Sequence, residues 1–180
     1  MKTHAAFFRN LNLGRANCPK RAQFETAFLD AGAESAQSFL VNGTMVFATR
    51  TDAQSRKVLS AASQALHASC GLQEPAFLRR IEDLTAMVAT NPFEHVDPAS
   101  VYACCVTFLH ADAVVPAQAP RSSTRGDVEL IDIRADAVFS VSRIIGRSQG
   151  SPNAFLEKLL GLPTTTRAWN TVVRLVDKHG

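Results

Sequence analysis

The stretch GRSQGSPN, from Gly146 to Asn153, places glycines, hydroxyl side chains and an arginine directly before a predicted helix. The helix would begin at Ser151 and Pro152, and the free N–H groups and dipole of a helix N-terminus favour an anion. We therefore predict that Gly146, Arg147 and Ser148 bind a phosphate or carboxylate group. The alternative is an ordinary polar loop in which Ser151 caps the helix.

A second candidate is the loop RNLNLGR, from Arg9 to Arg15, which follows a predicted strand at His4–Phe8. An arginine at a strand end is costly to bury without a partner. Arg9 therefore either binds an anionic ligand or fixes the loop, by pairing with an acidic side chain or with backbone carbonyl groups.

The C-terminal stretch TTTRAWNT, residues 164–171, is the third candidate. A helical wheel of 100° per residue separates Trp169, Val172, Val173 and Val176 from Arg167, Asn170, Thr171 and Arg174. We expect a helix capped by Thr165 or Thr166, with Trp169 in the core. The polar stripe Arg167–Asn170–Arg174 is either a solvated face or a grip for an anion or a partner chain.

Other catalytic patterns are absent from the sequence, including the Gly-x-Ser-x-Gly elbow, the phosphate loop and His-Glu-x-x-His. The EHVDP stretch at 94–98 offers a histidine and two carboxylates, but it lies between a helix end and a strand, so we expect no metal and no cofactor. The acids Asp127, Glu129 and Asp132 share one predicted hairpin strand and should be solvated or paired across strands. An enzyme would have to use Ser148 or Asp136 as its base or nucleophile.

The composition indicates a globular protein. The chain has 180 residues, 46% of them hydrophobic, and a net charge of +3, which is too small to argue for nucleic acid by itself. From Arg143 to Gly180 the sequence has six Lys or Arg residues and two acidic residues. This positive charge either gathers in one patch or is spread over a solvated face. Four cysteines without metal spacing are expected to be reduced thiols of a cytoplasmic protein. Without an apolar run of about 18 residues, we expect no membrane partner.

The elements expected before residue 81 follow the order β-α-β-β-α-β. A helix opened by Pro19 ends at Gly32, and Asn42-Gly43 predicts a type I′ hairpin turn. Asp52 is expected to cap the next helix, and EPAFLRR to form a fourth strand. This is the ferredoxin-like order.

The second half is expected to begin with a helix carrying Ile81, Leu84 and Met87. The stretch VYACCVTFL predicts a buried strand, DVELIDI and AVFSVS a hairpin, and two helices close the chain. We therefore predict an α+β fold with ferredoxin-like antiparallel sheets, helices packed on one face, and two similar halves, 1–80 and 81–180.

Three blocks of the sequence resemble the bacterial family called domain of unknown function 1697 (DUF1697). They are FFRNLNLGR, similar to the family's Leu-Leu-Arg-Gly-Ile-Asn-Val-Gly-Gly; the hairpin FLVNGTMVF; and GRSQGSPNAFLEKLLGLPTTTRAWNTVVRL, similar to its Gly-Arg-Ser-Lys and Thr-Thr-Arg-Asn-Trp-Asn-Thr motifs. The positions that match include Arg9, Asn12, Gly14, Gly146, Arg147, Ser148, Arg167 and Asn170. The chain departs from the family pattern at Asn10, Arg15, Asn42, Thr44 and Gln149.

The resemblance implies a plait-related α+β fold in two parts and no established activity. We rank first a binding module for an anionic or phosphorylated ligand, a nucleotide or RNA, through the Arg, Asn and Gly loops. A protein–protein interaction module with structural motifs is the alternative. An enzyme that holds a small anionic substrate with Arg147 and Arg167 ranks third.

Overall fold

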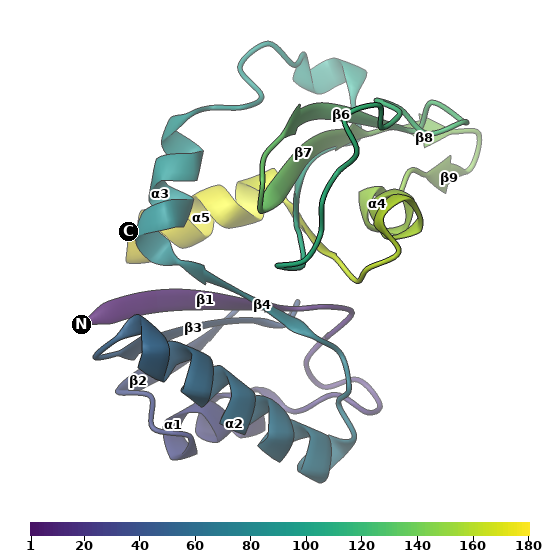
Figure 1. Cartoon of the computed structure of the whole chain (residues 1–180). Helices are drawn as coiled ribbons and strands as arrows, with labels where there is room; N and C mark the ends of the chain where they lie inside the picture. The colour runs from purple at the N-terminus through teal and green to yellow at the C-terminus, as the bar shows by residue number, and fades with distance from the viewer. The chain divides into compact units, whose positions relative to one another are not determined.

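The computed structural model describes residues 1–180, which divide into two compact units, Met1–Leu84 and Thr85–Gly180. Helices and antiparallel sheets occur in both units, which confirms the predicted α+β class (Figure 1). The finer assignments, a ferredoxin-like plait and two similar halves, stay predictions.

The first unit contains one four-stranded sheet and two helices. Its elements are β1 (Lys2–Phe8), α1 (Arg21–Asp30), β2 (Ser35–Phe39), β3 (Thr44–Thr49), α2 (Asp52–Cys70) and β4 (Ala76–Arg80). The strand order is β2-β3-β1-β4, and each neighbouring pair is antiparallel. The β-α-β-β-α-β order expected from the sequence is therefore present.

An aromatic core joins the helices of this unit to the sheet. Both α1 and α2 lie on the same face of the sheet (Figure 1), and Phe24 and Phe28 of α1 meet Phe8 and Phe47 at ring-centroid distances of 5.0–6.2 Å. All four rings are buried. The three- and four-residue spacing of apolar side chains in α1 and α2 produces this core.

The predicted type I′ turn at Asn42-Gly43 is wrong. Phe39 pairs with Thr44, so four residues connect the strands, and the positive φ angles fall at Leu40 (59°) and Gly43 (69°). Contacts with residues 8–13 hold this turn, because the Leu13 amide donates to the Val41 carbonyl at 2.9 Å and a Cβ on Gly43 would lie 2.7 Å from the Cβ of Leu11. The loop before α1 thus packs against the turn and fixes its shape.

The predicted cap of α2 is displaced by one residue. Thr51 is extended and its hydroxyl accepts a hydrogen bond from the Gln54 amide at 3.2 Å, as expected of an N-cap. Asp52 is instead the first helical residue, and its carboxylate is hydrogen-bonded to His4.

The second unit is built on a sheet with the strand order β10-β5-β7-β6. Its elements are α3 (Ile81–Ala89, which crosses the boundary), a 3₁₀ turn (Pro98–Ser100), β5 (Ala103–Phe108), β6 (Val128–Ile133), β7 (Ala137–Ser142), β8 (Ile144–Ile145), β9 (Ser148–Gln149), α4 (Pro152–Leu160), β10 (Thr165–Ala168) and α5 (Trp169–His179). The short strands β8 and β9 form a separate ribbon.

Helices cover both faces of this second sheet, whereas the sequence predicted one face. Val138 of β7 shares a buried cluster with Leu156 of α4. The next residue, Phe139, packs edge-on against Trp169 at the start of α5, with ring centroids 5.6 Å apart. Since neighbouring residues of a strand point to opposite faces, α4 and Trp169 lie on opposite faces.

The predicted helix start around Thr165 and Thr166 is also wrong. Residues 165–168 form an edge strand that pairs antiparallel with β5, Thr165 opposite Phe108 and Arg167 opposite Val106. The Thr166 hydroxyl lies 2.8 Å from that of Thr107, across this pair. Pairing with the free edge of β5 therefore outweighs the local helical pattern, and α5 begins at Trp169.

Candidate functional site

A groove about 630 Å³ in volume opens in the second unit beside α4, and we call it the α4 groove. The residues that line it are Pro120, Ser123, Thr124, Arg125, Asp127, Val128, Gln149, Ser151, Ala154, Phe155, Lys158 and Leu159. They come from α4 and its N-cap, from the first residue of β6 and the loop before it, and from the end of the β8–β9 ribbon, which lies next to α4 in Figure 1. Ligand pockets typically enclose about 300–1,000 Å³, so a small molecule fits.

One stripe of α4 forms a wall of the groove. Ala154 and Phe155 lie three and four residues after Ser151, and Lys158 lies four and three residues after them, so all four share one face of the helix. Leu156 points the other way and is fully buried against the sheet. The amphipathic pattern of the helix thus turns one side to the core and the other to the groove.

The opposite wall is a loop held by its own side chains. The Ser123 hydroxyl donates to Asp127 Oδ1 at 2.6 Å and accepts from the Val128 amide at 3.1 Å. Asp127 is buried, and its second carboxylate oxygen lies 3.5 Å from Arg125 Nε. The carboxylate is thereby satisfied by a hydroxyl and a cation of its own loop.

Gly150 brings the two walls together. A Cβ at this position would lie 2.0 Å from the Asp127 carbonyl oxygen, so no other residue fits there. The Asp127 carbonyl also accepts from the Arg143 amide at 2.8 Å, and the Gly150 amide donates to the Arg143 carbonyl at 3.0 Å. These contacts join the end of the ribbon to the loop before β6.

The stretch GRSQGSPN contributes to the groove, but not through the residues nominated from the sequence. Gly146 (φ 65°) and Arg147 form the exposed turn between β8 and β9, and neither lines the groove. Ser148 lies beside it, where its hydroxyl accepts from Arg125 Nη2 at 2.7 Å. Gln149 and Ser151 are the members of the stretch that line the groove.

The N-terminus of α4 is capped by the protein itself. The Ser151 hydroxyl accepts from the Ala154 amide at 3.2 Å, and Pro152 has no N–H to offer. The helix end therefore retains little capacity to bind an anion through its backbone, and the Ser151 cap expected as the alternative is present.

Two cations of the groove, Arg125 and Lys158, were missed by sequence reasoning. Arg125 also donates to the Ile145 carbonyl at 3.2 Å, which holds the guanidinium near the ribbon. The Lys158 side chain is exposed, two helical turns beyond Ser151. The sequence does carry one signal for Lys158. This lysine lies seven residues, or two helical turns, after the cap residue Ser151 and therefore on the same face of the helix.

The loop from Arg9 to Arg15 belongs to the first unit, where Arg9 forms an ion pair with Glu74, with Nη1 and Oε2 2.7 Å apart. This is the acid pairing that the sequence left as the alternative to ligand binding. Asn12 accepts through its carbonyl from the Arg15 amide, and Gly14 (φ 82°) donates to the Pro19 carbonyl. Backbone contacts thus close the loop on itself.

Arg167 and Asn170 do not form one polar stripe. Arg167 lies on β10, is buried, and donates to the Thr165 hydroxyl at 2.8 Å and the Thr166 carbonyl at 3.0 Å. Burial lowers the pKa of its guanidinium to about 10, so the group is still charged at neutral pH. Asn170 is exposed on α5.

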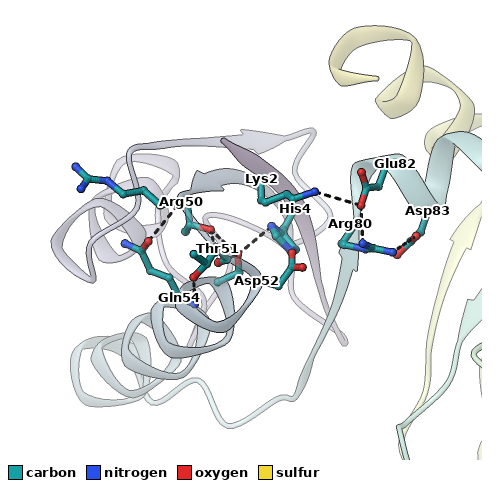
Figure 2. Close-up of polar contacts among 11 residues, drawn as sticks. Lys2, His4, Arg50, Thr51, Asp52, Gln54, Arg80, Glu82 and Asp83 are labelled. Atoms are coloured by element: carbon teal, nitrogen blue, oxygen red, sulfur yellow. Dashed lines mark hydrogen bonds and ion pairs between the residues drawn. The ribbon is translucent and has the colours of Figure 1, made fainter.

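A buried polar network around His4 was not foreseen. Its Nε2 lies 3.1 Å from Asp52 Oδ1 (Figure 2). Its Nδ1 lies 3.0 Å from the Ser55 hydroxyl. These are the residue types of a hydrolase triad. Ser55 is fully buried, however, and its hydroxyl is also 2.5 Å from that of Thr49. The network therefore ties β1 and β3 to the first turn of α2, and no substrate can reach the serine.

The chain has no cluster of metal-ligating side chains and no membrane-spanning helix. No three His, Cys, Asp or Glu side chains lie close enough together to hold a metal ion. None of the helices combines the length and apolarity needed to cross a lipid bilayer.

Comparison with known proteins places the chain in a family. The model of the family described as "Protein of unknown function (DUF1697)" matches residues 1–139. The chain belongs to this family. The match ends before the β8–β9 turn, so the α4 helix lies beyond it. No curated protein matches the sequence.

A solved structure, described as that of a conserved bacterial protein from Streptococcus pneumoniae, has a similar fold. It superposes with a TM-score of 0.68 over 99% of this chain and 98% of that chain, at 17% sequence identity. Identity this low carries the fold alone. The DUF1697 chain therefore shares its fold with a conserved bacterial protein.

Proposed function

We propose that this DUF1697 protein is a binding module for a small anionic, phosphorylated ligand that occupies the α4 groove. The observation that carries the proposal is the exposed amine of Lys158, which has no acidic partner, on the wall of a groove that also holds Arg125. Exposed hydroxyls of Thr124 and Ser151 and the amide of Gln149 supply further hydrogen-bond donors.

The charges of the groove favour an anion of low charge. The lining of the groove includes two cations, Arg125 and Lys158, and one carboxylate, that of Asp127. The Asp127 carboxylate is buried, and one of its oxygens lies 3.5 Å from Arg125 Nε, so Arg125 offsets its negative charge. Lys158 is the cation left to neutralise an incoming phosphate, as a mobile point charge.

Thermal shift of the purified protein against phosphorylated compounds tests this proposal. A ligand at 100 times its dissociation constant stabilises the protein by about 2.7 kcal/mol. We expect a shift that Lys158→Ala abolishes and that Lys57→Ala, an exposed lysine within α2, leaves intact. A shift retained in full by Lys158→Ala contradicts the proposal.

A second function, protein–protein interaction, is favoured by one observation. Ile144 and Ile145 of the ribbon are 54% and 40% exposed, next to the exposed Arg147. Exposed apolar side chains beside an arginine are typical of interface residues. Replacing both isoleucines with Thr should then abolish capture of a partner from cell extract without changing ligand-induced thermal shifts.

A further inference from the structure

We infer that the ligand of the α4 groove is a phosphate monoester of a flat ring system, of which a nucleoside monophosphate is the representative. The inference rests on the proposed function, and it adds the part of the ligand that is not charged.

The spacing of side chains along α4 sets the length of the ligand. Ser151 and Lys158 are seven residues apart, which corresponds to about 10.5 Å along a helix axis and to the same helical face. Ala154 and Phe155 lie between them on the groove wall. The groove therefore presents polar groups at both ends of an apolar middle, and a bare phosphate would leave that middle uncovered.

The apolar middle is suited to a ring. Phe155 is half-buried, packs on one side against the core cluster of the unit, and lines the groove. Pro120, Val128 and Leu159 complete the apolar lining. A nucleobase stacks favourably on an aromatic side chain, because every base has a π-face. A ring held here places its phosphate within reach of either end of the stripe.

Charge and volume limit the size of the ligand. Two cations and one carboxylate line the groove. Their net positive charge is too small to neutralise the several negative charges of a triphosphate. A volume of about 630 Å³ accommodates one nucleotide. We therefore expect the monophosphate to bind better than the triphosphate.

Calorimetric titration with orthophosphate, adenosine, AMP and ATP tests the inference. We expect AMP to bind at least about 10-fold more tightly than orthophosphate or adenosine, a difference of about 1.4 kcal/mol. Phe155→Leu, which keeps the apolar packing and removes the ring, should bring AMP affinity down to that of orthophosphate. Lys158→Ala should weaken both AMP and orthophosphate, and Lys57→Ala neither.

The outcomes separate the two proposals. Equal affinity for AMP and orthophosphate, or full AMP affinity in Phe155→Leu, overturns the flat-ring inference and leaves anion binding intact. Absence of binding by all four compounds overturns both. If Phe155→Leu fails to fold, Ala154→Glu serves instead, because Ala154 is exposed and a glutamate there places a carboxylate in the middle of the groove. Unchanged AMP affinity in Ala154→Glu overturns the inference.

Discussion

Arg167 belongs to a motif that suggested ligand binding, but its contacts indicate a structural role. Its guanidinium is buried and donates to the Thr165 hydroxyl and the Thr166 carbonyl. We predict that Arg167→Ala lowers the free energy of unfolding by at least about 3 kcal/mol, because it leaves buried acceptors unsatisfied and opens a cavity. Denaturant unfolding measures this, with the exposed Arg174→Ala as the matched control. An unchanged melting temperature in Arg167→Ala would refute the structural role.

Cys105 provides a pH-dependent test at the same scale. Burial, and then the neighbouring Cys104, raise the pKa of its thiol from 9.0 to about 11. Between these values the unfolded chain has lost the proton and the folded chain has kept it, so the unfolded state binds fewer protons and stability falls as pH rises. The stabilisation is complete below pH 9 and is lost through pH 11.

We therefore predict that the stability advantage of the wild type over Cys105→Ala shrinks by about 2 kcal/mol between pH 8 and pH 11, since each pKa unit corresponds to about 1.4 kcal/mol and the folded thiol is half ionised at pH 11. Urea unfolding at a series of pH values measures the difference. Parallel pH dependence of the two proteins would contradict the burial of a protonated thiol.

At the scale of elements, the junction between the ribbon and the loop before β6 depends on Gly150. We predict that Gly150→Ala destabilises the protein by several kcal/mol, on the order of 3, because its Cβ would overlap the Asp127 carbonyl. The control is Gly146→Ala, which meets open space and carries only the cost of its positive φ, about 1 kcal/mol. Thermal unfolding that ranks Gly146→Ala as the more damaging change would contradict the junction.

Elements whose signal is local could be predicted from the sequence, and those set by distant partners could not. The apolar spacing of α2 predicts a helix, and the stretches DVELIDI and AVFSVS predict the hairpin of β6 and β7; both predictions are confirmed. Residues 165–168 read as a helix start because their pattern is helical, but the unpaired edge of β5 recruits them as β10. The turn at 40–43 is similarly shaped by Leu11, which is distant in sequence.

The candidate site shows the same division. The polar stretch GRSQGSPN supplies two residues of the α4 groove, Gln149 and Ser151, but the role of the groove stays a prediction. Arg125 joins the groove through a contact between segments 23 residues apart, to Ser148, which no local pattern encodes. By contrast, Arg9 and Arg167 are held by contacts within their own units. Resemblance to a motif alone therefore does not distinguish a ligand-binding arginine from a structural one.

At the scale of the whole molecule, the net charge of +3 and one exposed groove lysine predict a weak dependence of ligand affinity on salt. Each phosphate contact contributes about −0.9 to the slope of log affinity against log salt concentration. A nucleic acid that makes about 6–10 such contacts therefore gives a slope several-fold steeper than a single contact does. We predict a slope between 0 and about −2 for AMP, measured by titration from low to moderate salt. A steeper slope with oligonucleotides, together with weak AMP binding, would identify RNA as the partner instead.

The most direct test of the central claim is the NMR spectrum of the ¹⁵N-labelled protein titrated with AMP. Binding in the α4 groove predicts saturable shifts of the amides of Arg125, Gln149, Ala154, Phe155 and Lys158, and none at Lys57 of the first unit. Shifts confined to the Arg9–Arg15 loop or to Arg147 at the ribbon turn, or no shifts at all, would contradict the assignment of the groove as the ligand site.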